Sequence, residues 1–266
     1  MYATFIAAVL FLLATVTTSV AVRYEARTEA MKESRARVEQ SRIAEGLYAY
    51  REQFGRLPDS LDQLASSPGF EQLRSYRNEW QRYMHASDLS DGTWRFERAA
   101  SWTVARRDGA NSVSSENSCG AGDFTTAASW CGPRDGVWHR LETRELFSEE
   151  IAQEKLRQRR TLQLFSDYWT TRQAFPRVAA SGQQLGTGQM LPLPVMAGYA
   201  GTADSCSGVH VWMGIPLDCA ALFDVWGSPV GYQYQSDTYV ILASEAPFSA
   251  ADGRRVIVAS PLNIQG

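Results

Sequence analysis

The chain has 266 residues, of which 44% are hydrophobic and 21% are charged, and its formal net charge is -3. This apolar content excludes an intrinsically disordered chain, and the length leaves room for one large domain or two domains of about 100 residues each. The charge lacks the basic excess typical of nucleic-acid binding, and three histidines leave little for histidine-based metal or acid–base chemistry.

The N-terminal segment is apolar, and residues 2–22 carry no charged side chain. A helix over these residues would be about 31 Å long, which is enough to cross the hydrocarbon core of a bilayer. We therefore expect a transmembrane anchor at residues 1–22, in a single-pass protein of the bacterial inner membrane in contact with its lipid. The alternative is a secretory signal peptide that is cleaved after Ala21.

The anchor is expected to continue into an amphipathic helix. Between residues 23 and 54 there is no Pro and only one Gly, and apolar residues recur at helical spacing. The sequence predicts one continuous helix of about 50 residues, ended by Pro58, whose second half packs on a globular domain. Two helices with a break near Arg23 are the alternative. The apolar stripe consists of Val38, Ile43, Leu47, Tyr50 and Phe54.

The four cysteines form two local pairs, Cys119 with Cys131 and Cys206 with Cys219. They contain no C-x-x-C, and no histidine stands at zinc-ligand spacing. Two short disulfide loops favour an oxidising compartment, whereas the basic residues that follow the apolar segment favour the cytoplasm for that side. We give the cysteines more weight and expect the globular part to be periplasmic.

The first globular unit is expected over residues 23–138. After Pro58, a short helix capped by Asp59 or Ser60 is predicted, followed by a strand at residues 92–97. A turn at residues 99–101 would lead into a second strand at 102–105, and the hairpin would pack on the long helix.

The second unit is expected over residues 139–266 and repeats this order. A helix at 141–175, ended by Pro176, precedes alternating strands at 230–234, 239–243 and 255–259. The predicted fold class is therefore α+β: a long N-terminal helix, half transmembrane, packed on a small antiparallel sheet, with a second helix-plus-sheet unit. A chance recurrence of a common element order is the alternative to duplication.

Two stretches of the chain contain distinctive motifs. One comprises residues 47–50, 54–58 and 61–64, in which Gly55 and Pro58 form a Gly-x-x-Pro. The other is an Asp-x-Trp-Gly-x-Pro run that leads into a Tyr-bearing strand, and its fold-motif residues are Asp224, Trp226, Gly227 and Pro229. Both stretches resemble type IV pilins and the pseudopilins of type II secretion.

The resemblance implies a non-enzymatic component of pilus biogenesis or protein secretion that acts through contacts with other pilin or secretion-system subunits. Pilins begin with a basic leader and have a glutamate at the fifth mature position, and neither is found at the start of this chain. An accessory membrane protein, such as the PilM type of thin-pilus systems, is therefore expected rather than a fibre subunit. The second class of function is a secreted or surface-anchored, adhesin-like binding module.

The sequence offers few residues for chemistry, and no cofactor or small-molecule ligand is expected. A third class, a periplasmic hydrolase, would use Ser205 or Ser207 with His210, although we interpret both serines as solvated residues of a disulfide loop. A calcium site would use Asp204, Asp218 and Asp224, but no EF-hand spacing exists. The preferred interpretation is that Asp224 accepts a hydrogen bond within the turn at Gly227. Most tryptophans are expected in the core, with Trp130 as the exposed one.

Overall fold

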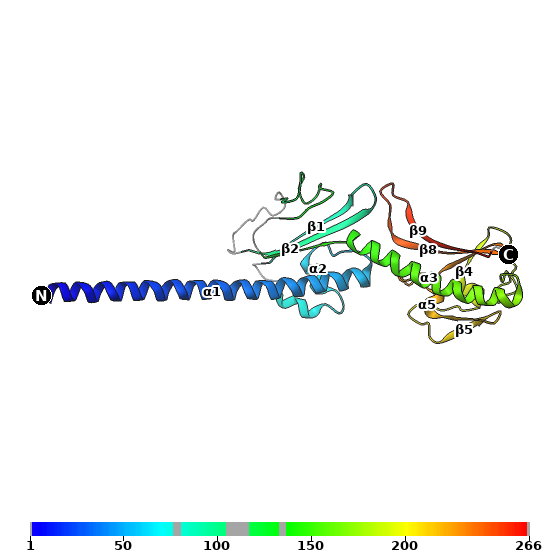
Figure 1. Ribbon diagram of the computed structural model, residues 1–266, viewed down its shortest axis with the longest axis horizontal. Coiled ribbons are helices and arrows are strands. Elements are labelled where there is room, and N and C mark those ends of the chain that lie inside the picture. Colours follow the sequence, from blue (N-terminus) through cyan, green and yellow to red (C-terminus); the bar gives the residue numbers. More distant parts are fainter. Residues whose placement is uncertain (1, 77–80, 105–116, 133–136, 265–266) are drawn as a thin grey trace. The chain divides into compact units, whose positions relative to one another are not determined.

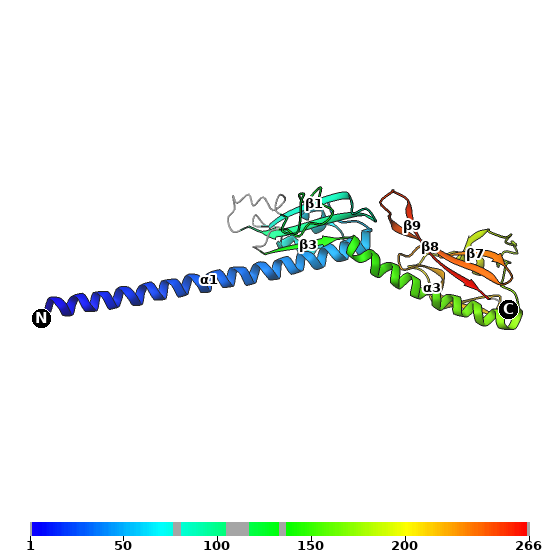
Figure 2. The ribbon, with the colours of Figure 1, turned by 45° about the horizontal axis from the view of Figure 1, so that its top comes forward.

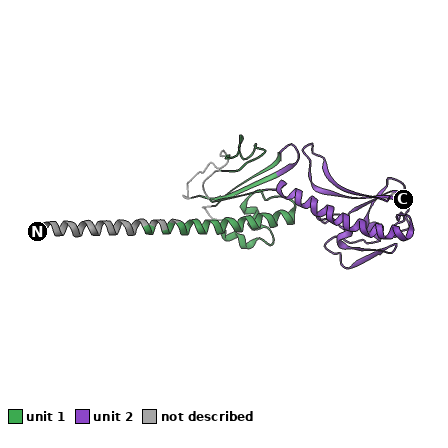
Figure 3. Ribbon diagram, viewed as in Figure 1, with its two compact units in different colours: residues 1–89, 97–141 green, residues 90–96, 142–266 purple. Residues whose placement is uncertain are grey.

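The structure, a computed structural model, describes residues 2–76, 81–104, 117–132 and 137–264; the side chains of residues 2–22, 25, 26 and 29 lie outside the described part. The fold is α+β with antiparallel sheets. By their internal contacts, residues 1–89 with 97–141 form one compact unit, and residues 90–96 with 142–266 form the other (Figure 3). The units expected from the sequence, residues 23–138 and 139–266, do not include this assignment of residues 90–96 to the second unit.

Helix α1 (Tyr2–Phe54) is continuous, with no break at Arg23. It ends before Pro58, because Gly55 adopts a left-handed conformation (φ 71°) that a Cβ would strain. Ion pairs one turn apart follow its exposed part, such as Arg35 with Glu39 at 2.9 Å.

The predicted membrane anchor is wrong. Among the helices of the described residues, none combines the length and the apolar character that crossing a bilayer requires. The expectation of an anchor at residues 1–22 in a single-pass inner-membrane protein is corrected accordingly, and with it the localisation that placed the globular part on the periplasmic side of that membrane.

The first unit packs a sheet, in the order β1-β2-β3, and two short helices against the C-terminal part of α1 (Figure 1). Ile43, Leu47 and Tyr50 of α1 are at most 2% exposed. A Cβ at Gly46 would overlap the Leu73 side chain, so this glycine permits the close approach of η1. The elements are α2 (Leu61–Ser66), η1 (Glu71–Tyr76), β1 (Gln81–Ser90), β2 (Arg95–Thr103) and β3 (Trp138–Glu142).

The hairpin of this unit differs from the prediction. The predicted turn at residues 99–101 lies inside β2, where Ala99, Ala100 and Ser101 are fully buried. Ser101 donates a 2.6 Å hydrogen bond to Gln40 of α1, so small residues are needed where helix and strand meet closely. The true turn falls at residues 91–94, before β2 begins.

The second unit has a four-stranded antiparallel sheet, in the order β4-β7-β8-β9, with α3 (Arg144–Arg172) along one side (Figure 2). Phe165 of α3 stacks on Tyr232 with 5.2 Å between ring centroids, and both are fully buried. The hairpin of β5 and β6 covers the same core with Trp212. The other elements are β4 (Met190–Pro192), α4 (Leu193–Ala197), β5 (Val209–Trp212), β6 (Ile215–Asp218), α5 (Cys219–Leu222), β7 (Gly231–Ser236), β8 (Tyr239–Ser249) and β9 (Arg255–Asn263).

Candidate functional site

The strongest candidate site surrounds the turn of residues 224–229, hereafter the Asp224 turn. Asp224 is 2% exposed, and its Oδ1 accepts hydrogen bonds from the backbone N–H groups of Trp226 (3.0 Å) and Ser228 (2.8 Å). Gly227 has a φ of 79°, which suits glycine, and Pro229 bridges back to Phe223 before β7 begins. The structure thus brings the predicted motif residues together in one tight turn.

A fully buried glutamate of α3 supports this turn. Glu154 accepts a 3.0 Å hydrogen bond from the backbone N–H of Val225 through Oε2. Its Oε1 accepts bonds from the Ser244 hydroxyl of β8 (2.7 Å) and the Gln158 amide (3.0 Å). Gln158 also donates to the carbonyl of Val258 in β9. One helix side chain therefore connects the turn to the sheet.

The Asp224 carboxyl lies in an unfavourable electrostatic position. Its Oδ2 is buried and has no hydrogen-bond partner among the described residues. Burial, with the charge of Glu154, raises the pKa of Asp224 to about 6, although the N–H groups of Ser228 and Trp226 and the Arg157 guanidinium oppose the shift. The turn therefore contains a carboxyl that titrates close to neutrality.

Trp226 fixes the other end of the turn on α3. Its indole Nε1 donates a 2.9 Å hydrogen bond to Glu150, and its ring meets Phe248 edge to face with 5.9 Å between centroids. The site therefore positions a turn on a helix. Most of its polar groups are engaged in hydrogen bonds that shape the fold, and the exceptions among the described residues include Asp224 Oδ2 and Gln158 Oε1.

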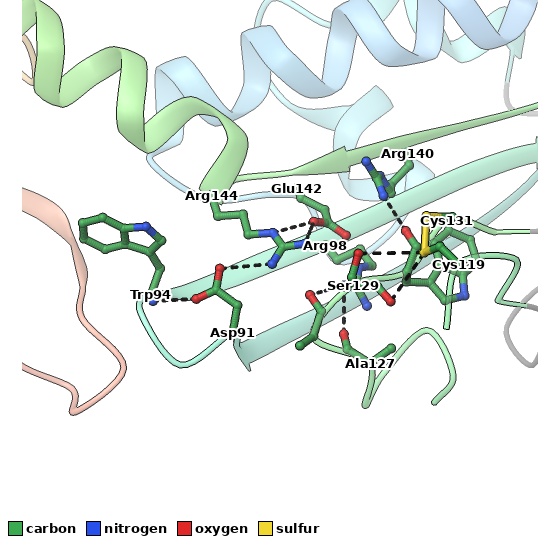
Figure 4. A network of polar contacts seen from close by, with 12 residues as sticks. Asp91, Trp94, Arg98, Cys119, Ala127, Ser129, Cys131, Arg140, Glu142 and Arg144 are labelled. Carbon is green, nitrogen blue, oxygen red and sulfur yellow. Dashed lines mark hydrogen bonds and ion pairs between the residues drawn. A yellow bond between two sulfur atoms is a disulfide. The ribbon is translucent and has the colours of Figure 1, made fainter. Parts of the chain in front are cut away.

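A second cluster, also within the second unit, surrounds Arg144 at the start of α3 (Figure 4). The guanidinium contacts Glu142 at 2.7 Å and Asp91 at 3.0 Å, and it lies 4.5 Å from the centre of the Phe96 ring. Burial alone would raise the pKa of Asp91, but the N–H groups of Trp94 and Thr93 together with Arg144 lower it overall. We call residues 91, 96, 142 and 144 the Arg144 cluster.

Both predicted cysteine pairs are disulfides. The S–S distances are 2.15 Å for Cys119–Cys131 and 2.10 Å for Cys206–Cys219. Trp130, expected to be exposed, is instead fully buried, because its ring packs edge to face on Phe124 at 5.0 Å. The loop that the first disulfide closes therefore has an aromatic core of its own.

A variant with serine at both Cys206 and Cys219 is expected to lose about 2–3 kcal/mol of unfolding free energy in the second unit, because the unfolded chain gains the freedom of an open loop. Amide hydrogen exchange of β7 and β8 measures this. Serine at both Cys119 and Cys131 is the matched control and should leave β7 and β8 protected; equal protection in the two variants would contradict the prediction.

Residues near the second disulfide do not assemble as the hydrolase alternative requires. The Ser205 hydroxyl accepts a hydrogen bond from Thr202 N–H (2.9 Å) and contacts the Tyr199 hydroxyl. The His210 ring contacts the Tyr199 ring at a tilt of 53°, and its Nε2 lies 3.9 Å from the Cys206 sulfur. No contact between Ser205 and His210 occurs in the described structure.

Two of the three aspartates considered for calcium, Asp218 and Asp224, have separate structural roles. Asp218 caps α5 by accepting from Ala221 N–H, and Asp224 is buried in its turn. The described residues contain no group of three or more His, Cys, Asp or Glu side chains arranged to hold a metal.

The Gly-x-x-Pro residues lie in the loop after α1. Gly55 N–H donates to the Arg51 carbonyl and closes the helix, and the Pro58 carbonyl accepts from the Tyr83 hydroxyl of β1 at 2.5 Å. Ser60, one of the two predicted caps, accepts from Gln63 N–H at the start of α2. This loop joins the helix to the sheet of the first unit.

Comparison with protein-family models, with curated proteins and with solved structures finds no match.

Proposed function

We propose that this protein is a pilin- or pseudopilin-like component of a type IV pilus or type II secretion machine, and that it acts without catalysis, through contacts with other subunits. The observation that carries the proposal is the Asp224 turn, whose motif resembles that of pseudopilins and which is fixed on α3 through Glu154 and Trp226. The disulfide at Cys206–Cys219 and the antiparallel sheet beside α3 are consistent with it.

The exposed part of α1 offers a surface for such contacts. Tyr24, Met31 and Val38 recur every seven residues and are 73%, 62% and 57% exposed. Residues seven apart lie on one face of a helix, so these side chains form an apolar row in water. Helical segments of partner subunits could cover this row.

Photo-cross-linking in the organism that encodes the protein tests the proposal. A photoreactive residue at Met31 is expected to give adducts that mass spectrometry identifies as pilin or pseudopilin subunits. The same residue at Arg254, whose side chain is 86% exposed in the turn between β8 and β9, is the control and should give fewer adducts. If adducts at Met31 contain no such subunit, the proposal fails.

A further inference from the structure

The hairpin of β5 and β6 has an apolar face that folding does not require. Its inner face buries Trp212, Ile215 and Leu217, each at most 2% exposed, against the core of the second unit. On β5 the outward positions are Val209 and Val211, which are 58% and 69% exposed. Because the inner face already supplies the burial that holds the hairpin in place, polar residues would serve equally well on the outer face.

The turn of this hairpin also has an apolar residue where a polar one is expected, at Met213. Met213 and Gly214 have φ values of 53° and 93°, the left-handed pair that a two-residue hairpin turn needs. Asn, Asp or Gly is favoured at the first position, whereas an unbranched apolar side chain there adds strain. Met213 is nevertheless 51% exposed and extends the apolar row of Val209 and Val211.

A groove adjoins the end of this row. Its volume is about 350 Å³, and the last turns of α3 and the hairpin turn form its walls. Asp167 in the groove accepts from the Gln163 amide at 3.0 Å, whereas no carboxylate of the described residues lies within ion-pair distance of Arg172. The Arg172 guanidinium therefore has no ion-pair partner among the described residues, although the Asp167 carboxylate also lines the groove. Its other lining residues include Leu164, Tyr168, Met213, Ile215 and Pro216.

We infer that the row of Val209, Val211 and Met213, together with this groove, is a docking surface for a short segment of a partner protein that carries large apolar side chains next to a carboxylate. The apolar side chains would cover the row and enter the groove, and the carboxylate would pair with Arg172. The inference rests on the proposed function, since it names where a component that acts by contact receives a partner.

The extent of the surface favours a short segment over a second copy of the chain. Three exposed side chains and one groove offer a few hundred Å² at most, whereas a stable complex of globular partners buries roughly 800 Å² on each side. The Arg172 guanidinium, which forms no ion pair among the described residues, also favours a partner segment that supplies a carboxylate.

Selection of random peptides displayed on phage, against the purified full-length chain, tests the inference. The selected sequences are expected to combine large apolar residues with Asp or Glu. Fluorescence anisotropy of a selected, synthesised peptide should show binding weakened at least about tenfold by Val211→Ser and by Met213→Asn. Met213→Asn should also raise or preserve the melting temperature, because asparagine suits the turn, so lost binding would not reflect unfolding.

Ile257→Ser is the matched control, since Ile257 is 67% exposed on β9 and should not affect the peptide. Arg172→Ala should abolish the preference for acidic peptides. The inference is overturned if no selected peptide binds more tightly than about 100 µM, if binding survives both hairpin substitutions, or if Val211→Ser instead dissolves a dimer of the chain. Because the assay uses the purified chain, its failure is distinguishable from a failure of cross-linking in cells.

Discussion

Arg144→Ala is expected to lower the free energy of unfolding of the second unit by about 3 kcal/mol, because it removes a cation from a largely buried ion-pair cluster. The Glu142 side chain is fully buried, so its carboxylate would lose this guanidinium where water cannot replace it. The substitution also removes the contact with Asp91 and the stacking on Phe96. Chemical denaturation, followed by hydrogen exchange of α3, measures the loss.

Two further variants distinguish the cluster from an ordinary surface ion pair. Arg144→Lys keeps the positive charge but loses the planar guanidinium that can contact two carboxylates. Its free energy of unfolding should therefore lie between those of wild type and Arg144→Ala. Arg254→Ala removes a solvent-exposed pair with Asp252 and should change stability little. Equal stability of Arg144→Ala and Arg254→Ala would contradict the role assigned to the cluster.

The cluster also predicts the direction of an acid effect. Because the pKa of Asp91 is lowered in the folded protein, its contribution is present above its ordinary value of 3.8 and is lost as pH falls through the folded value. Arg144→Ala removes one cause of that lowered pKa. The stability of this variant should therefore depend less on pH in the acidic range than the stability of wild type does.

Periodicity in the sequence predicted the long elements well. Ile43, Leu47 and Tyr50 of the predicted apolar stripe lie on the buried face of α1, whereas Val38 and Phe54 at its ends are 57% and 41% exposed. The alternation after Val230 corresponds to β7 and β8. These elements have one buried face each, and a repeating face is what a pattern of residue types records. The same signal predicted β9, but not β4 or the two-stranded sheet of β5 and β6.

Elements whose burial depends on distant partners were missed. Apolar and polar residues alternate poorly along strand β1, Gln81–Ser90, because its polar side chains form hydrogen bonds with other elements. Gln81 bonds to α1, and Tyr83 bonds to Pro58 in the loop that follows α1. The prediction that Trp130 is exposed is wrong for a similar reason, since the burial of Trp130 depends on its contact with Phe124 across the disulfide loop. Local composition does not reveal such contacts.

The candidate site was predictable only in part. Asp224, Trp226 and Gly227 are adjacent in the sequence, so a local motif could identify their turn. Glu154 lies seventy residues earlier on a helix rich in charge, where a glutamate is normally solvated, and only the fold shows that it is fully buried beneath the turn. Gln158 and Thr161 follow Glu154 at helical spacing and are also buried. These uncharged polar residues on an otherwise charged helix are a weak sequence signal that this face of α3 is buried.

Asp224→Asn is expected to make the second unit more stable than wild type at pH 8 and to remove the loss of stability that wild type undergoes as pH rises from about 4 to about 6. The folded pKa of Asp224, about 6, exceeds its ordinary value of 3.8. A raised carboxyl pKa means that the folded state binds the proton more tightly, so stability is greatest below pH 3.8 and declines as pH rises through 6. After allowance for solvent screening, the decline should be about 1–2 kcal/mol.

The asparagine keeps the acceptor for the N–H groups of Trp226 and Ser228 and replaces the buried, unpartnered Oδ2 with an uncharged group. Urea denaturation at a series of pH values from 4 to 8 should therefore show a flatter midpoint profile for Asp224→Asn. Glu154→Gln separates the two causes of the shift: without the neighbouring charge, the transition should move toward lower pH but persist, because burial is the larger cause. A wild-type pH profile that survives unchanged in Asp224→Asn would show that another group titrates there, and the electrostatic account of the turn would be wrong.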